Sequence, residues 1–407
     1  MTGIGDRGWA RRAGLAGAAL GVMAAGVATG VAVERLTVHR AVRRRARLTL
    51  EAACPYGSLR GTPGRAVADD GTELYYEIDV PDAPDGAGDP APTVVFSHGY
   101  CLTQDVWHFQ RAALRGSAPA SSPPVPAPRA VYWAQRGHGR SGRGQAGTPV
   151  TIDRLGHDLK AVLDAAVPEG PVVLVGHSMG GMTMMALAAQ YPRYIAERVA
   201  GVALLGTSAG GLAEATYGLP AAGARALQRM APGVLRTLAV RAELVERGRR
   251  ATADLFSSLV KRYSFGTRDI DPGVARFAER LIGSVPVDVV ADFYPAFAEH
   301  EKTAALAAFD SGRPALILTG DRDLLTPREH SEAMAEVLPE AELVVVEGAG
   351  HLVMLECPEL VDGHLTALVA RTIHTHGHTA PPDRGDRPED PFGDATADHR
   401  TDRRRHS

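Results

Sequence analysis

Short apolar runs, separated by stretches with helical spacing, organise the middle of the 407-residue chain. Seven runs have the length and β-branched content of strands: Glu73–Val80, Thr93–Ser97, Ala130–Ala134, Val172–Val175, Val199–Leu205, Ala315–Leu318 and Glu342–Val346. Three helical stretches lie between several of them: Ile152–Ala166, Met179–Gln190 and Arg328–Leu338. Continuous apolar runs are typical of parallel strands that are buried on both faces. The pattern therefore predicts an α/β fold with a doubly wound, mostly parallel sheet.

The alternation is interrupted once, over residues 210–302, which carry helical patterns, scattered aromatic residues and no clear strand. We predict a helical cap there, inserted between two strands of the sheet. Most of its aromatic side chains would form the core of the cap, and a few would line an apolar substrate pocket. The core is then expected over residues 51–209 and 303–373. Residues 374–407 contain few apolar side chains and are predicted to be a disordered tail.

The N-terminal segment, residues 1–50, contains a long uncharged stretch. Residues 13–33 carry no charge and are flanked by arginines, most of them on the C-terminal side. About 20 apolar residues span a bilayer, so the segment is predicted to be a single-pass membrane anchor. The positive-inside rule would then keep the catalytic domain in the cytoplasm. A cleaved signal peptide, which would mean secretion, and a helix of a cytoplasmic protein remain alternatives.

Composition adds few constraints. The hydrophobic share of 45% and charged share of 22% are ordinary for a globular protein, and the formal net charge is −3. Nothing in this balance indicates a nucleic-acid partner. The three cysteines have neither metal-site spacing nor the pattern of a disulfide framework. No metal or organic cofactor is implied, and the oligomeric state stays open.

A Gly-x-Ser-x-Gly pentapeptide is the first sign of chemistry, and the chain contains two, centred on Ser178 and Ser208. A nucleophilic serine needs a sharp turn between a strand and a helix. The run Val172–Val175 leads into the first pentapeptide and Met179–Gln190 leaves it, so Ser178 is the predicted nucleophile. The second is followed by Gly210-Gly211, a poor start for a helix, which indicates a loop leading into the cap.

The remaining catalytic groups are predicted from their positions after strands. His351 follows the run Glu342–Val346 and is the expected general base. Asp321 and Asp323 both follow Ala315–Leu318; Asp323 is the preferred acid, because Asp321 suits a turn cap. An oxyanion hole would combine the backbone N–H groups of Tyr100, in a His-Gly-Tyr loop, and Met179.

These motifs together resemble the α/β-hydrolase family, in particular its cap-bearing esterases, lipases and serine haloperoxidases. The resemblance covers residues 60–370 and is carried by five segments: Phe96-Ser97-His98-Gly99, Arg136 to Gly142, Gly176 to Gly181, the Asp323 segment with Pro327, and Gly350-His351. The resemblance implies the chain order Ser178, Asp323, His351 and a structural role for the loop Arg136 to Gly142. Because this chain has a serine as nucleophile, the resemblance argues against epoxide hydrolase and haloalkane dehalogenase activity.

The leading hypothesis is hydrolysis of a carboxylic ester of an acyl or aromatic small molecule through an acyl-enzyme. Thioesterase, carbon–carbon bond hydrolase and serine-type haloperoxidase activities on the same scaffold are the alternatives, and fold analogy does not choose among them. A membrane-tethered binding protein on a hydrolase scaffold that has lost its activity is a hypothesis from another class. The full set of catalytic residue types in this chain argues against it.

Overall fold

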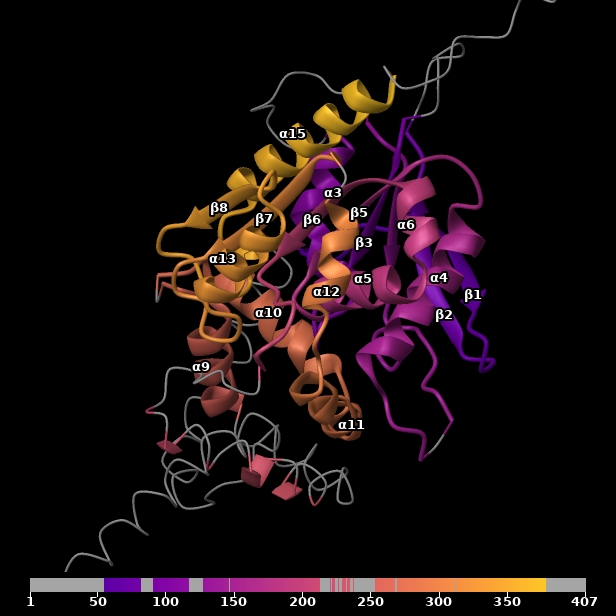
Figure 1. The fold of residues 1–407 in the computed structure, drawn as a ribbon. Helices are drawn as coiled ribbons and strands as arrows, with labels where there is room; N and C mark the ends of the chain where they lie inside the picture. Colours follow the sequence, from indigo (N-terminus) through magenta and orange to yellow (C-terminus); the bar gives the residue numbers. More distant parts are fainter. Residues whose placement is uncertain are drawn as a thin grey trace, which may run out of the picture.

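The computed structural model describes residues 55–377, apart from 82–90, 117–126, most of 213–252 and residues 146, 268 and 311. Its centre is an eight-stranded sheet of order β1-β2-β4-β3-β5-β6-β7-β8 (Figure 1). The strands are β1 Thr62–Val67, β2 Glu73–Asp79, β3 Thr93–Ser97, β4 Ala130–Trp133, β5 Val172–His177, β6 Val199–Leu205, β7 Ala315–Gly320 and β8 Glu342–Val346. Strand β2 is antiparallel to both its neighbours, and every other neighbouring pair is parallel. The predicted mostly parallel α/β sheet is confirmed.

Helices connect the strands and cover the sheet. They are η2 Gln104–Trp107, α3 His108–Leu114, α4 Ile152–Ala166, α5 Met179–Gln190, α6 Pro192–Arg198, α9 Ala253–Ser264, α10 Pro272–Ser284, α11 Val287–Ala298, α12 Thr303–Leu306, η4 Ala307–Phe309, α13 Arg328–Val337, α14 Val353–Glu356 and α15 Pro358–Gly377. Helix α4 begins where the Thr151 side chain accepts a hydrogen bond from the backbone N–H of Arg154, which satisfies a donor that a helix start leaves free.

Successive side chains of the central strands point to opposite faces of the sheet, and each face has its own core. Val175 of β5 and Leu205 of β6 pack with residues of α10, α14 and α15. Leu174 and Leu204, one residue earlier, pack with residues of α4, α5, α6 and α13. Burial on both faces explains why these strands read as continuous apolar runs.

Strand β1 is the strand of this sheet that the hydrophobic pattern did not predict. It is an edge strand with mostly exposed or partly exposed side chains, and it contains Pro63 and Gly64. Proline is tolerated at a sheet edge, where its missing N–H breaks no central hydrogen-bond ladder. The strand is held by backbone pairing with β2. Such pairing does not require alternating apolar side chains, so the sequence shows no strand pattern here.

Between β6 and β7, the described part of residues 210–302 is largely helical, with α9, α10 and α11 as its main elements. Helix α11 packs over the start of α5, where Phe293 and Val289 share an apolar cluster with Met179 and Met182. Helix α10 instead joins the core of the sheet through Phe277 and its neighbours. The division of the chain into a core and a cap stays a prediction.

At the C-terminus, α15 continues to Gly377, four residues into the stretch that composition predicts as a tail. The Thr372 and Thr375 hydroxyls each donate to the carbonyl oxygen one turn earlier, and Leu368 and Val369 are buried against the sheet. The helix therefore extends beyond Thr372, the last buried residue among its described side chains. The rest of the predicted tail lies outside the described residues.

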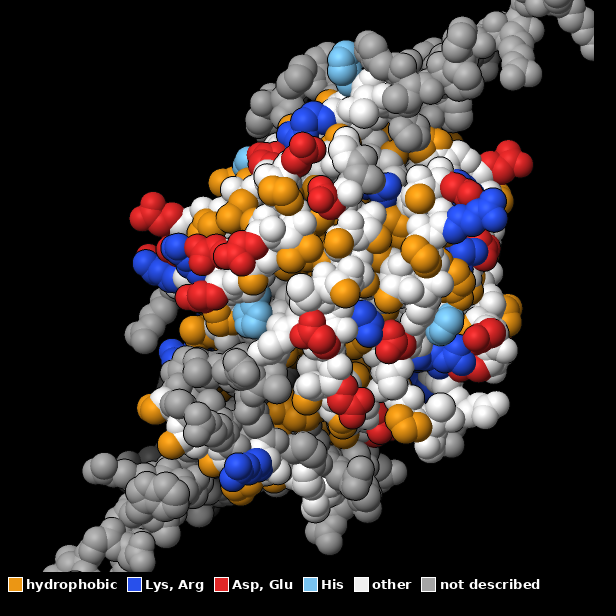
Figure 2. All heavy atoms as spheres, in the orientation of Figure 1, with side chains coloured by type: hydrophobic (Ala, Val, Ile, Leu, Met, Phe, Trp, Pro, Cys, Tyr) orange, Lys and Arg blue, Asp and Glu red, His pale blue; other side chains and the backbone are white. Residues whose placement is uncertain are grey.

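Within the described ranges, no single helix combines the length and the apolar character needed to cross a bilayer; α10 and α11 meet that test only as a pair bent by 90°. The predicted anchor, residues 13–33, lies outside those ranges. On the face drawn in Figure 2, acidic and basic side chains are interspersed among apolar ones. No single sign of charge dominates that face.

Candidate active site

Ser178 occupies the turn between β5, which ends at His177, and α5, which begins at Met179. Its backbone has φ 52° and ψ −121°, a conformation that costs free energy for any residue with a Cβ. The turn is held from β6: Ser178 N–H donates to the Leu205 carbonyl at 2.9 Å, and the Thr207 hydroxyl donates to the Ser178 carbonyl at 2.7 Å. The surrounding structure thus fixes a strained serine at the end of a central strand.

The glycines of the pentapeptide are required by close backbone contacts. A Cβ on Gly180 would lie 2.0 Å from the carbonyl oxygen of Ser97, and one on Gly176 would lie 2.6 Å from the amide nitrogen of Gly181. Backbone atoms cannot move aside as a flexible side chain can. Both positions therefore exclude a larger residue for packing reasons.

Asp323 and His351 meet at the same edge of the sheet, after β7 and β8. His351 Nδ1 lies 2.8 Å from Asp323 Oδ2. The carboxylate also accepts from the backbone N–H of Leu325 at 2.8 Å and of Thr326 at 3.0 Å, and from the Thr326 hydroxyl at 2.8 Å. Burial raises the pKa of Asp323, but His351 and these donors outweigh it and hold the pKa below its usual value. An ionised carboxylate only accepts, so Nδ1 carries the proton and Nε2 is left as the basic nitrogen.

The His351 loop adjoins the end of β5. His177 Nε2 donates to the His351 carbonyl oxygen at 2.9 Å, and the two imidazole rings are 4.8 Å apart. Burial lowers the pKa of His177 to about 3, so this imidazole is neutral and serves as a packing and hydrogen-bonding group. The structure brings Asp323 to His351, whereas Asp321 is exposed and accepts from the Gly348 amide at 2.7 Å.

The loop 98–100 lies directly against the serine. A Cβ on Gly99 would be 3.1 Å from the Cβ of Ser178. The loop is held in place at His98, whose Nε2 accepts a hydrogen bond from the backbone N–H of Gln135 at 3.0 Å. Within the described part of the chain, no acceptor is found for the amides of Tyr100 or Met179. These two predicted oxyanion donors, like the three predicted catalytic residues, stay predictions.

The second pentapeptide has a different structure. Ser208 is fully buried, and its hydroxyl donates to the Gly210 carbonyl at 2.5 Å and lies 2.9 Å from His330 Nδ1. Among the described non-glycine residues only Ser178 and Cys101 have positive φ, so Ser208 does not sit on a strained elbow. Its carbonyl oxygen accepts from His300 Nε2 at 2.9 Å, which ties the chain leaving β6 to the segment after α11.

Three supporting side chains were missed from sequence. Thr326 and Thr207 bond to Asp323 and Ser178 respectively, and Glu356 bonds to the backbone beside His351. Thr326 lies three residues after Asp323, and a hydroxyl that close to a candidate site is the signal that could have found it. Thr207 lies 29 residues from Ser178 and has no such signal. Glu356 has no local signal, since its partners include residues about 90 positions away.

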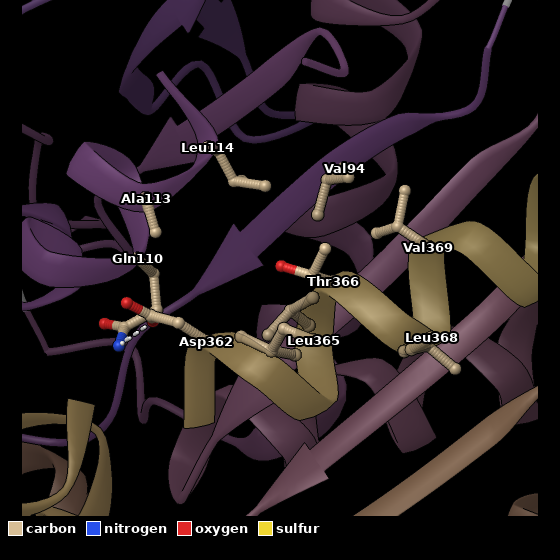
Figure 3. Close-up of a pocket in the computed structure, with 10 residues that line it drawn as sticks. Val94, Gln110, Ala113, Leu114, Asp362, Leu365, Thr366, Leu368 and Val369 are labelled. Carbon is tan, nitrogen blue, oxygen red and sulfur yellow. Dashed lines mark hydrogen bonds between the residues drawn. The ribbon is translucent and has the colours of Figure 1, made fainter. Parts of the chain in front are cut away.

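A mostly apolar pocket is lined by residues of α3, α15 and the strands β3 and β5 (Figure 3). Its polar lining includes Gln110 and Asp362, and the Gln110 amide donates to Asp362 at 2.8 Å. Burial raises the pKa of this carboxyl to about 7. None of the predicted catalytic residues lines this pocket.

The family model described as the alpha/beta hydrolase fold matches residues 92–358, more than half of the chain. The chain belongs to this family of hydrolases. The eight-stranded, mostly parallel sheet with helices around it agrees with that membership.

Several known proteins are similar to the chain. The dihydrolipoyllysine-residue acetyltransferase component of an acetoin cleaving system from Pseudomonas putida is 27% identical over 70% of this chain, but the match spans only 65% of that protein. A monoacylglycerol lipase from Mycolicibacterium smegmatis is 27% identical over 70% of this chain and 88% of the lipase. An esterase structure from Thermogutta terrifontis has a TM-score of 0.56 and 25% identity, covering 76% of this chain and 98% of the esterase.

Proposed function

We propose that the chain hydrolyses carboxylic esters of acyl or aromatic small molecules through an acyl-enzyme on Ser178. The observation that carries the proposal is the strained backbone of Ser178, φ 52°, at the edge of the sheet where Asp323 and His351 are paired. Strain of this kind persists only where the surrounding structure enforces it, and it gathers at functional sites. Similarity to an esterase and to a monoacylglycerol lipase supports ester substrates.

The proposed reaction assigns one role to each group. Ser178 Oγ attacks the ester carbonyl carbon while His351 Nε2 takes its proton, and the amides of Tyr100 and Met179 hold the oxyanion. Collapse of the tetrahedral intermediate breaks the C–O bond, and His351 returns the proton to the leaving alcohol. A water molecule, deprotonated by His351, then attacks the acyl-enzyme, releases the acid and restores Ser178. Asp323 keeps the proton on Nδ1 throughout.

The residues around the oxyanion loop support an apolar substrate. The Tyr100 ring packs at 4.9 Å against Phe297 and at 6.2 Å against Phe293, both on α11. Its hydroxyl donates to the Val290 carbonyl of the same helix. Aromatic side chains beside a few polar groups are the ordinary lining of a small-molecule site.

Labelling with a fluorophosphonate probe, followed by a panel of p-nitrophenyl esters, tests the proposal. The wild-type chain should be labelled on Ser178, should hydrolyse the esters, and should lose both properties in Ser178→Ala. Labelling that persists in Ser178→Ala would contradict the nucleophile assignment. Labelling of the wild type without turnover of any ester would contradict ester hydrolysis and direct the search to thioester, carbon–carbon or peroxidase chemistry.

For the N-terminus we propose a single-pass anchor over residues 13–33 with the catalytic domain in the cytoplasm, supported by the uncharged stretch and its basic flanks alone. The full-length chain should sediment with membranes, and a variant lacking residues 1–47 should not. Full-length protein recovered in the supernatant would contradict the anchor.

A further inference from the structure

Glu356, at the end of α14, makes an unusual set of contacts for a side chain outside the predicted triad. Its carboxylate accepts hydrogen bonds from three backbone N–H groups. Oε1 lies 3.0 Å from the Thr267 amide and 3.1 Å from the Gly266 amide. Oε2 lies 3.0 Å from the Gly266 amide and 2.7 Å from the Gly350 amide. Hydrogen bonds to an ionised acceptor are about twice as strong as neutral ones.

These donors belong to two separate parts of the chain. Gly350 precedes His351 directly, in the loop that carries the predicted base. Gly266 and Thr267 belong to the segment 264–267, which joins α9 to α10 in the helical insertion between β6 and β7. A single side chain therefore bonds the loop of the base to the insertion, and it lies five residues after that base.

The segment 264–267 also touches the His351 loop directly. Leu352 N–H donates to the Ser264 carbonyl at 2.8 Å. A Cβ on Gly266 would lie 2.2 Å from the Gly348 carbonyl oxygen, and one on Gly350 would lie 2.5 Å from the Gly266 amide nitrogen. Two backbones meet here at a distance that only glycine permits. Phe265, buried against the core, fixes the segment in place.

We propose that Glu356 is a positioning residue that clamps the segment 264–267 onto the loop of His351, so that the helical insertion sets the place of the general base. This inference rests on the proposed function, because it assigns His351 that role. The insertion would then be part of the catalytic apparatus as well as a wall of the substrate site. A shift of about 1 Å in a catalytic group lowers the rate by about 10²-fold.

The test compares Glu356→Gln with Glu359→Gln as a matched control, since Glu359 is an exposed glutamate three residues further along. The glutamine variant keeps the side-chain length but places an amide NH2 where one of the carboxylate oxygens accepted. We expect Glu356→Gln to fold, to lower kcat for a p-nitrophenyl ester by about 10- to 100-fold, and to change KM less than about threefold. Fluorophosphonate labelling of Ser178 should slow by the same factor as kcat.

A second variant disturbs the same contact from the insertion side. Gly266→Ala adds a methyl group against the Gly348 carbonyl, and Gly363→Ala, where a Cβ meets nothing within 4 Å, is its control. Gly266→Ala should reproduce the loss in kcat and in labelling rate although Glu356 is intact. Glu356→Asp keeps a carboxylate at this position. It should nevertheless have a low kcat like that of Glu356→Gln, because the shorter side chain does not reach both segments.

The outcomes separate this inference from the proposed function. A folded Glu356→Gln or Gly266→Ala variant with kcat and labelling rate within about twofold of its control would overturn the clamp. Loss of folded protein in both variants, measured at 10 °C as well as at 25 °C, would overturn it too, because Glu356 would then be a determinant of the fold. A wild-type chain that the probe does not label would overturn the proposed function and this inference together.

Discussion

The two Gly-x-Ser-x-Gly pentapeptides have the same pattern of residues and come after neighbouring strands, yet they form different structures. Ser178 stands on a turn with positive φ between β5 and α5, and its two glycines press against backbone. Ser208 follows β6 without a positive φ and is fully buried, and its hydroxyl donates a hydrogen bond to the Gly210 carbonyl oxygen. The next residues along the chain account for the difference: a helix begins at Met179, whereas a Gly-Gly pair comes after Ser208.

The second pentapeptide nevertheless supports the first. The Thr207 hydroxyl bonds to the Ser178 carbonyl, and the Leu205 carbonyl accepts from the Ser178 amide. The motif by itself therefore does not place a serine on a strained turn, and the second pentapeptide instead holds the backbone of the first. Substitutions in the two turns should therefore have unequal effects.

The largest expected effect separates the two serines. Ser178→Ala should lower kcat for an ester substrate by about 10⁵-fold or more, since it removes the predicted nucleophile. Ser208→Ala should stay within about threefold of the wild type, because its hydroxyl is buried in a hydrogen bond within the chain. Steady-state kinetics measure both variants. A large loss in Ser208→Ala with an active Ser178→Ala would reverse the comparison.

The two aspartates extend the comparison to the acid. Asp323→Asn should lower kcat by about 10⁴-fold, because an amide in place of the carboxylate favours the wrong tautomer of His351. Asp321→Asn should change kcat less than about threefold, since Asp321 is exposed and accepts from Gly348. The same ester assay is used, with circular dichroism to establish folding. Equal losses in the two variants would contradict the assignment of Asp323.

One glycine from each pentapeptide, Gly180 and Gly210, allows the two turns to be compared by the free energy of unfolding. Gly180→Ala should lower the free energy of unfolding by about 3 kcal/mol or more, because its Cβ meets the Ser97 backbone. Gly210→Ala should cost about 1 kcal/mol or less, because its Cβ meets the Glu301 carboxylate, which can swing away. Urea unfolding followed by fluorescence measures both. A mild Gly180→Ala variant would show that the turn has more room than its backbone contacts allow.

The smallest effect concerns pH and the histidine beside Ser178. Burial lowers the pKa of His177 from 6.5 to about 3. Between these values the unfolded chain binds a proton that the native chain does not. This group's contribution to stability is therefore complete above pH 6.5 and is lost as the pH falls.

His177→Gln keeps a donor for the His351 carbonyl and removes the titration. Its stability relative to the wild type should improve by about 2 kcal/mol between pH 7 and pH 5. His330→Gln, on the Ser208 side, should show a smaller change in the same direction, because burial also lowers the pKa of that more exposed histidine. Thermal unfolding at both pH values measures the two variants. Identical pH profiles for His177→Gln and the wild type would contradict the neutral state of His177.

Much of the fold could be predicted from the chain. The six continuous apolar runs are all strands, three of them with the predicted ends, and α4 and α5 begin and end where their helical periods do. Strands of a parallel sheet that are buried on both faces require a continuous run of apolar residues, which can be recognised in the sequence. Helix caps require particular residues at the helix start, which can also be recognised locally. Strand β1 escaped prediction because its sequence contains Pro63 and Gly64 and only two apolar side chains besides that proline.

The sequence by itself determined which residue types are available for catalysis and in which order they come after the strands, since glycine spacing and strand ends are local properties. The sequence favoured Asp323 over Asp321 as the acid, but only the tertiary structure brings Asp323 to His351 and turns Asp321 toward the Gly348 amide, because these partners lie on separate loops after β7 and β8. It also decided the places of Thr207 and Glu356. Their partners lie 29 and 90 residues away, and contacts over such separations arise from packing and leave no pattern along the chain.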